Sequence, residues 1–79
     1  MKRVTIFGKE GCGYCKRAKE LAEIKSLEFK YFDIHQEGIS KADLEKTVGK
    51  PVHTVPQIFI GQQHIGGDTE FAAHLSAQA

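Results

Sequence analysis

The segment Cys12–Gly13–Tyr14–Cys15 holds the two cysteines of the chain, with two residues between them. A disulfide across so short a loop adds little stability, because the entropic effect of a crosslink grows with the number of residues that it encloses. Two thiols at this spacing can instead exchange disulfides: one thiolate attacks a disulfide, and the other thiol resolves the mixed disulfide that forms. The pattern therefore favours a redox pair over a structural crosslink.

A metal site is the main alternative for these two cysteines. Structural zinc takes four protein ligands. Besides the two thiols, the chain offers His35, His53, His64 and His74. These histidines lack the compact spacing of a zinc finger, and a CxxC pair in a β-α-β context is itself typical of redox motifs. We expect no metal site and assign no chemistry to His64.

The two thiols are expected to differ, because they occupy different places on a predicted helix. Apolar residues recur with helical spacing from Cys12 to about Lys25, so Cys12 lies at the start of that helix. Helix N-termini carry unpaired N–H groups and a positive partial charge, which stabilise a thiolate. Basic neighbours outnumber acidic ones: Lys9, Lys16, Arg17 and Lys19 against Glu10 and Glu20. We expect Cys12 to be the exposed nucleophile and Cys15, one turn further on the apolar side, to be the shielded resolving thiol.

Two strands are predicted to flank this helix. Residues 3–7 are a β-branched and aromatic run, typical of a buried strand, and residues 28–34 are rich in aromatic residues. A strand, a helix and a strand in succession predict a β-α-β unit, with parallel strands and a right-handed crossover.

The second half of the chain adds one helix, a hairpin and a last helix. Ser40 and Asp43 form a partial capping box that starts a helix running to about Val48. The remaining elements are a strand at 57–60, its antiparallel partner at 64–66 and a helix at 69–76. The order β-α-β-α-β-β-α predicts an α/β fold, in which a four-stranded mixed sheet is sandwiched by three helices.

Length and composition argue against several classes of protein. The 79 residues suit one domain, 1–79, and a net charge of +1 lacks the basic surplus of a nucleic-acid binder. No apolar run approaches the length of a membrane span, and the N-terminus lacks the long apolar region of a signal peptide. We expect a monomeric, cytoplasmic protein that binds neither nucleic acid nor membrane.

Four motifs, in order along essentially the whole chain, resemble the glutaredoxin family, and most closely its small bacterial glutaredoxin 1 type. They are IFGKEGCGYCKRAKELAE, DIHQEGISKADLEK, TVPQIFIGQQHIGG and TEFAAHL. The resemblance implies a thioredoxin-like fold and a glutathione-dependent dithiol oxidoreductase. Its substrates would be protein disulfides and glutathione mixed disulfides, with ribonucleotide reductase as one protein that receives its electrons.

The same resemblance implies a glutathione site. In the family, the residue before a cis proline pairs its backbone with the tripeptide, which assigns Val55 and Pro56. The resemblance also places the γ-glutamyl end of the ligand at Gly67, Asp68, Thr69 and Glu70, and the rest of it at Lys9, Tyr14 and Thr54. A glycine allows close backbone approach, and a helix N-terminus binds a carboxylate.

Two of these assignments have alternatives when the residues are taken alone. A trans turn before a strand is then the better interpretation of Val55–Pro56, since cis X–Pro bonds are a minority. Gly66–Gly67 could be only a turn, and Glu70 only an acid that stabilises the first turn of its helix.

Two residues depart from the family pattern. Gly13 stands where proline is commonest, and in this it resembles glutaredoxins that hold a [2Fe–2S] cluster between two protomers with bound glutathione. A cluster-binding dimeric module is therefore the second hypothesis. Asp68 stands where the closest relatives carry an aromatic residue. Its carboxylate would weaken glutathione binding unless it turns away to cap the helix.

Overall fold

The computed structural model describes residues 3–52 and 55–77, and in this part of the chain four strands and three helices alternate as predicted. The elements are β1 (Val4–Gly8), α1 (Gly13–Ile24), β2 (Phe29–Asp33), α2 (Lys41–Val48), β3 (Gln57–Ile60), β4 (Gln63–Gly66) and α3 (Asp68–Ala77). The order β-α-β-α-β-β-α is confirmed. Within these described residues, no helix is both long and apolar enough to cross a membrane.

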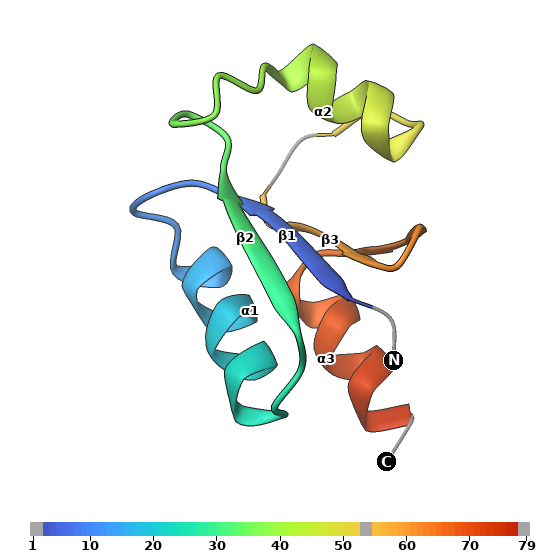
Figure 1. Cartoon of the computed structure of the whole chain (residues 1–79). Coiled ribbons are helices and arrows are strands. Elements are labelled where there is room, and N and C mark those ends of the chain that lie inside the picture. The colour runs from blue at the N-terminus through green and yellow to red at the C-terminus, as the bar shows by residue number, and fades with distance from the viewer. Residues whose placement is uncertain (1–2, 53–54, 78–79) are drawn as a thin grey trace.

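The strands form one mixed sheet in the order β2-β1-β3-β4 (Figure 1). β1 and β2 run parallel, with Val4 opposite Phe29 and Gly8 opposite Asp33. β3 runs antiparallel to β1, and β4 antiparallel to β3. β1 is therefore a central strand, and its carboxyl end leads directly into the loop that carries Cys12.

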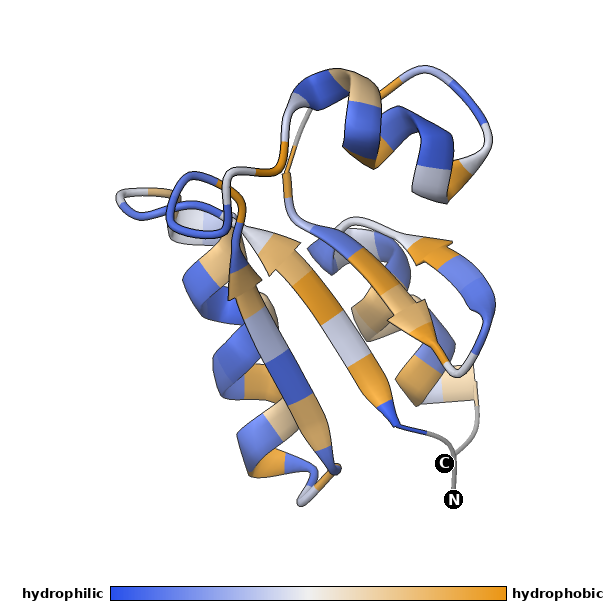
Figure 2. Ribbon diagram, turned by 45° about the horizontal axis from the view of Figure 1, so that its top comes forward, coloured by the Kyte–Doolittle hydropathy of each residue, from blue (hydrophilic) through white to orange (hydrophobic). Residues whose placement is uncertain are grey.

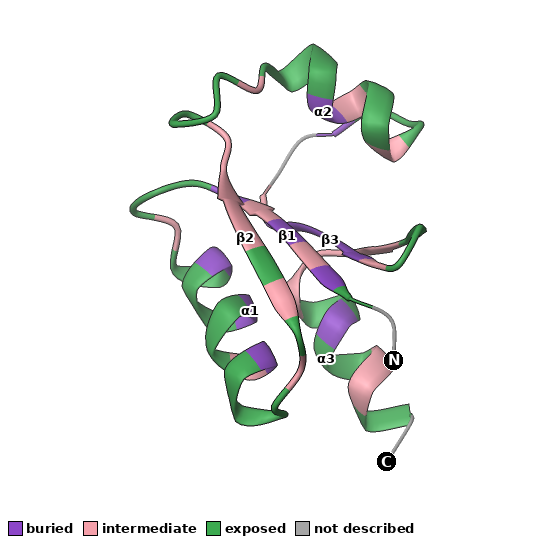
Figure 3. Cartoon of the chain, in the orientation of Figure 1, coloured by how far each residue is buried: buried purple, intermediate pink, exposed green. Residues whose placement is uncertain are grey.

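The hydrophobic core lies between the sheet and two helices. Burial alternates along β1, and its buried residues Val4 and Ile6 belong to the core. Buried segments, purple in Figure 3, occur on β1, α1 and α3. The apolar stripe of α1 has helical spacing, and its members are Cys15, Ala18 and Ala22. Small alanines let the helix lie close to the strands, and the fully buried Phe71 of α3 completes this core.

The sandwich is uneven, because α2 lies beyond one end of the sheet and not over its second face (Figures 1 and 2). That face carries an aromatic group instead. The ring centroid of Phe7 is 5.7 Å from that of Phe32 and 6.0 Å from that of Phe59. Phe7 and Phe32 consequently remain half-buried.

The predicted capping box at the start of α2 is complete. The Ser40 hydroxyl accepts from the Asp43 N–H at 3.0 Å, and the Asp43 carboxylate accepts from the Ser40 N–H at 3.2 Å. These bonds lower the pKa of Asp43. Gly49 ends the helix in the left-handed region at φ 88°, where glycine carries no steric penalty.

Candidate active site

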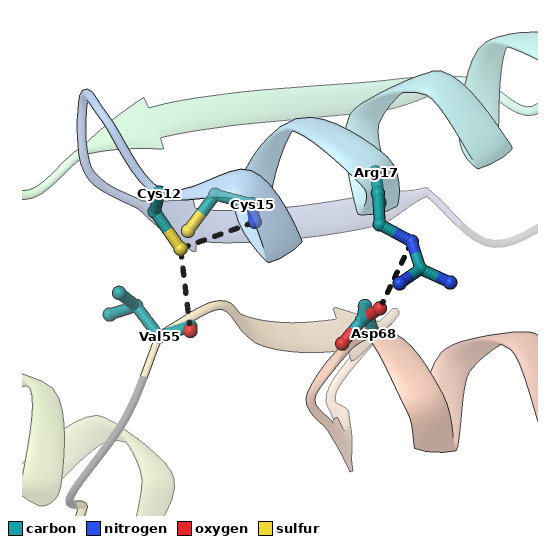
Figure 4. A network of polar contacts seen from close by, with 5 residues as sticks. All are labelled: Cys12, Cys15, Arg17, Val55 and Asp68. Carbon is teal, nitrogen blue, oxygen red and sulfur yellow. Dashed lines mark hydrogen bonds and ion pairs between the residues drawn. The ribbon is translucent and has the colours of Figure 1, made fainter.

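Cys12 is the N-cap of α1, as its place in the sequence predicts. Its Sγ accepts a hydrogen bond from the Cys15 N–H at 3.3 Å, and its thiol lies 3.7 Å from the Val55 carbonyl oxygen (Figure 4). The first bond satisfies one of the N–H groups that a helix start leaves unpaired. The sulfur is thus held at the positive end of α1, between that helix and the segment that enters β3.

Cys15 differs from Cys12 in its surroundings. Cys12 is half-buried, whereas Cys15 is fully buried on the inner face of α1. Burial, with the hydrogen bond to Cys12 as the second cause, raises the pKa of the Cys15 thiol to about 12. At neutral pH the inner sulfur is therefore protonated and poorly reactive until its proton is removed, as expected of a thiol that acts second.

A cavity of about 280 Å³ beside the cysteines gathers most of the residues that the sequence assigned to the ligand. It is lined by Tyr14, Val55, Pro56, Gly67, Asp68, Thr69 and Glu70. The Val55–Pro56 peptide bond is cis, as the family resemblance implied and the residues alone did not. Thr54 lies outside the described residues.

Lys9 does not line that cavity. It borders two other hollows, one of about 520 Å³ with Cys12 and Tyr31, and one of about 430 Å³ with Val55. Lys9 therefore lies near Cys12 but not in the cavity at the start of α3. An extended ligand would have to pass Cys12 to meet both Lys9 and the start of α3.

Glu70 binds the backbone at the start of its helix and also lines the cavity, while its pairing with the ammonium of a ligand stays a prediction. Its Oε1 accepts from the Gly67 N–H at 2.8 Å, so the carboxylate binds the backbone at the start of α3. A Cβ added to Gly66 would lie 3.0 Å from the same oxygen, and Gly66 has a φ of 123°. The glycine pair therefore makes room for Glu70, which also forms part of the cavity wall.

Asp68 lines the cavity and also contacts α1. Its Oδ2 lies 3.8 Å from Nε of Arg17 on α1 (Figure 4), and its side chain is only 15 % exposed. The Arg17 guanidinium also lies 5.8 Å from the centre of the Tyr14 ring. The positive charge of Arg17 partly offsets that of the carboxylate, and the weaker glutathione binding expected of Asp68 stays a prediction. Because Arg17 is largely exposed, this ion pair adds little to stability.

Tyr31 is a site residue that the sequence alone did not identify. The parallel register places it beside Ile6 on the buried face of the sheet, and its hydroxyl reaches to 3.5 Å from the Lys9 carbonyl oxygen. It lines the same hollow as Cys12. The signal available in the sequence was its alternation with Phe29 on a strand parallel to β1.

His64 has a hydrogen-bond partner within the sheet. His64 Nε2 lies 2.7 Å from Gln57 Oε1, so this histidine is a hydrogen-bonded strand residue, as expected. Among the side chains in 3–52 and 55–77, no three or more of the types His, Cys, Asp and Glu gather in a way that could hold a metal ion.

Comparison with known proteins gives a consistent result at three levels. The family model for glutaredoxin matches residues 4–65. Glutaredoxin 1 of Salmonella typhimurium strain LT2 is 67% identical over 74 residues, which covers 87% of this chain and 85% of that protein.

Solved structures agree in fold. The reduced Escherichia coli glutaredoxin superposes with a TM-score of 0.85 at 52% identity, covering 95% of this chain and 94% of the other. The buckwheat glutaredoxin–glutathione complex has a TM-score of 0.76 at 31% identity, covering 95% and 70% of the two chains. The architecture is therefore the thioredoxin-like fold.

Proposed function

This chain belongs to the glutaredoxin family of glutathione-dependent thiol–disulfide oxidoreductases, and we propose that Cys12 is its nucleophile and Cys15 its resolving thiol. One observation carries this assignment. The Cys12 sulfur caps α1 and Cys12 lines the hollow of about 520 Å³, while Cys15 is fully buried on the inner face of the helix. Of these two sulfurs, only the outer one is accessible to a disulfide on another protein, and the inner one is close enough to displace that protein from Cys12.

The proposed reaction consists of two exchanges. The Cys12 thiolate attacks a disulfide, a new S–S bond forms to Cys12, and one substrate sulfur leaves as a thiolate. The thiol of Cys15 then attacks Cys12, releases the second sulfur and forms a Cys12–Cys15 disulfide, which glutathione from solution reduces. In the alternative route, glutathione attacks the glutathione sulfur of a mixed disulfide, and Cys12 leaves as a thiolate. The N–H of Cys15 already points at the Cys12 sulfur, so it stabilises the thiolate on that atom before the attack and whenever glutathione displaces Cys12.

Glutathione is proposed to lie along the cavity with its thiol next to Cys12. The γ-glutamyl carboxylate would meet the N–H groups at the start of α3, near Thr69, and its ammonium would face Glu70. The tripeptide backbone would pair with Val55, and Lys9 would face the glycine carboxylate. The assignment is supported by the shared cavity and by the glutathione complex of the buckwheat relative.

The proposed clients are protein disulfides and mixed disulfides with glutathione, including the disulfide of ribonucleotide reductase. We also propose a single glutaredoxin domain over residues 1–79 that works in a reducing compartment, the bacterial cytoplasm. There the ambient redox potential keeps thiols such as these two reduced.

Cluster binding is the weaker function for this site. A [2Fe–2S] cluster takes four ligands, commonly thiolates. With Cys15 fully buried, each chain would contribute only Cys12, so the cluster would require a second chain and two thiols of bound glutathione. Gly13 leaves open space beside Cys12, since a Cβ there would meet nothing within 4 Å. Space alone supplies no ligand, and we therefore propose disulfide exchange as the function.

The test is glutathione-coupled reduction of a small glutathione mixed disulfide. Cys12→Ser should abolish turnover, because no other accessible sulfur replaces the nucleophile. Cys15→Ser should keep much of the activity, because glutathione can resolve the Cys12 mixed disulfide in its place. Turnover by Cys12→Ser equal to that of the parent protein would disprove the assignment.

A further inference from the structure

Tyr31 reaches the resolving cysteine through a space that Gly8 leaves open. Gly8 is the last residue of β1 and is buried. A Cβ added there would touch the Tyr31 hydroxyl oxygen, and it would lie 2.9 Å from Tyr31 Cζ and 3.0 Å from Cys15 Cβ. Three residues from three elements thus meet at one point beneath the start of α1, and no side chain at Gly8 separates the phenol from Cys15.

The phenol at this point is suited to donate a hydrogen bond. Burial, followed by the nearby Cys15, raises the pKa of Tyr31 to about 12, so the hydroxyl keeps its proton at neutral pH. Its present acceptor, the Lys9 carbonyl oxygen, is 3.5 Å away, at the outer limit of a hydrogen bond. The proton can therefore turn toward a stronger acceptor nearby at little cost.

The charges around the Tyr31 ring also favour donation of its hydroxyl proton to a negatively charged acceptor. Lys19 Nζ lies 5.7 Å from the centre of the Tyr31 ring, and the hollow beside the ring is lined by Lys9, Lys16 and Lys19 with Glu10 as the acid. The lining of this hollow is thus net positive, and the Asp33 carboxylate also acts on the phenol. A positive lining favours a negative charge on a sulfur close to the phenol.

We propose that Tyr31 is the positioning residue of the resolving step, and that its hydroxyl donates a hydrogen bond to the Cys15 sulfur as that sulfur becomes a thiolate. The step rests on the function proposed above. The Cys15 sulfur bonds to Cys12, the bond from Cys12 to the substrate sulfur breaks, and that sulfur leaves with the electron pair. The proton of Cys15 ends on the leaving thiolate, so the released product is a thiol.

The causes that set the pKa of Cys15 are consistent with this direction of donation. Burial raises this pKa most, whereas the backbone at Lys9 and, to a smaller extent, the nearby Tyr31 hydroxyl lower it. Without the hydroxyl, the inner thiol would lose a group that favours its reactive form. Glutathione acting from solution would not be affected, because it brings its own thiolate.

The experiment is a single-turnover measurement on Tyr31→Phe, which keeps the ring and removes only the hydroxyl. Reduced protein is mixed with a glutathionylated peptide, quenched with acid, and analysed by mass spectrometry for the Cys12 mixed disulfide. We expect the mixed disulfide to form at the parent rate and to decay about fivefold more slowly, the equivalent of one net hydrogen bond.

The same substitution is then made in the Cys15→Ser background, where glutathione performs the resolution. The proposal requires that the effect of Tyr31→Phe disappear in that background, which a general disturbance of the fold would not do. An unchanged decay rate, or an equal loss in both backgrounds, would overturn it. Formation of a mixed disulfide by Cys12→Ser would instead refute the proposed function itself, so the two failures are distinguishable.

Discussion

Cys12 and Cys15 are the same residue type, so the expected difference in reactivity between their sulfurs comes from the contacts that each sulfur makes. The Cys12 sulfur accepts the N–H of Cys15, whereas the Cys15 sulfur is enclosed by the core and lies beside Tyr31. Gly8 is the small residue that makes this enclosure possible, because any side chain there would occupy the place of the phenol or of Cys15. Gly8, which has no reactive side chain, therefore determines the surroundings of the reactive Cys15.

Replacing Gly8 by alanine is expected to destabilise the reduced protein by about 1–3 kcal/mol, the usual cost of overpacking a core. The added Cβ would contact Cys15 Cβ at 3.0 Å and force the phenol to move. Gly13→Ala is the matched control. A Cβ there meets nothing within 4 Å, and Gly13 lies in helical backbone, so this change should stabilise by about 0.5–1 kcal/mol. Urea unfolding measures both, and equal stabilities would contradict the packing argument.

Among the elements, α1 and α3 hold the site, while α2 stands apart from the sheet. The N-termini of α1 and α3 meet across the cavity, and Arg17 of α1 contacts Asp68 of α3 (Figure 4). α2 has one buried residue, Leu44, so its own end signals must contribute much of its stability. The Ser40 capping box supplies such a signal at its start.

Ser40→Ala should therefore lower the free energy of unfolding by about 1 kcal/mol, because the Asp43 N–H loses its acceptor. Ser76→Ala, at an exposed position within α3, is the control and should change stability by less than about 0.5 kcal/mol. Thermal or urea unfolding of the two variants gives the comparison. If Ser40→Ala were as stable as the control, the capping box would have no energetic role in α2.

At the scale of the whole molecule, the surface offers no large apolar patch among the described residues. The large hydrophobic side chains exposed there are Tyr14, at 58 %, and Ile24, at 75 %. They lie at opposite ends of α1, the first beside the active site and the second near the turn to β2. Two separate side chains do not form the contiguous apolar surface that a stable dimer buries.

We consequently expect one chain per particle in solution, with or without glutathione. Size-exclusion chromatography with light scattering should give a mass near 8.8 kDa for the reduced protein. The same measurement after anaerobic incubation with iron, sulfide and glutathione tests the cluster hypothesis. A coloured particle of twice that mass would contradict the monomer and restore the [2Fe–2S] module as a function of this chain.

The sequence by itself determined the order of the elements, the capping box at Ser40 and the place of Cys12 at a helix start. These features depend on local periodicity and on hydrogen bonds between residues close in the chain, which a linear pattern records. The cis bond before Pro56 and the grouping of the ligand residues required the family resemblance, because nothing local specifies them.

Only the tertiary structure decided the contacts between elements. The pairing of Asp68 with Arg17, the bond from Gly67 to Glu70 and the approach of Tyr31 to Cys15 each depend on which faces of separate elements meet. Strand register and helix packing set those meetings, and both result from burying the whole core at once. No stretch of the sequence taken alone contains that information.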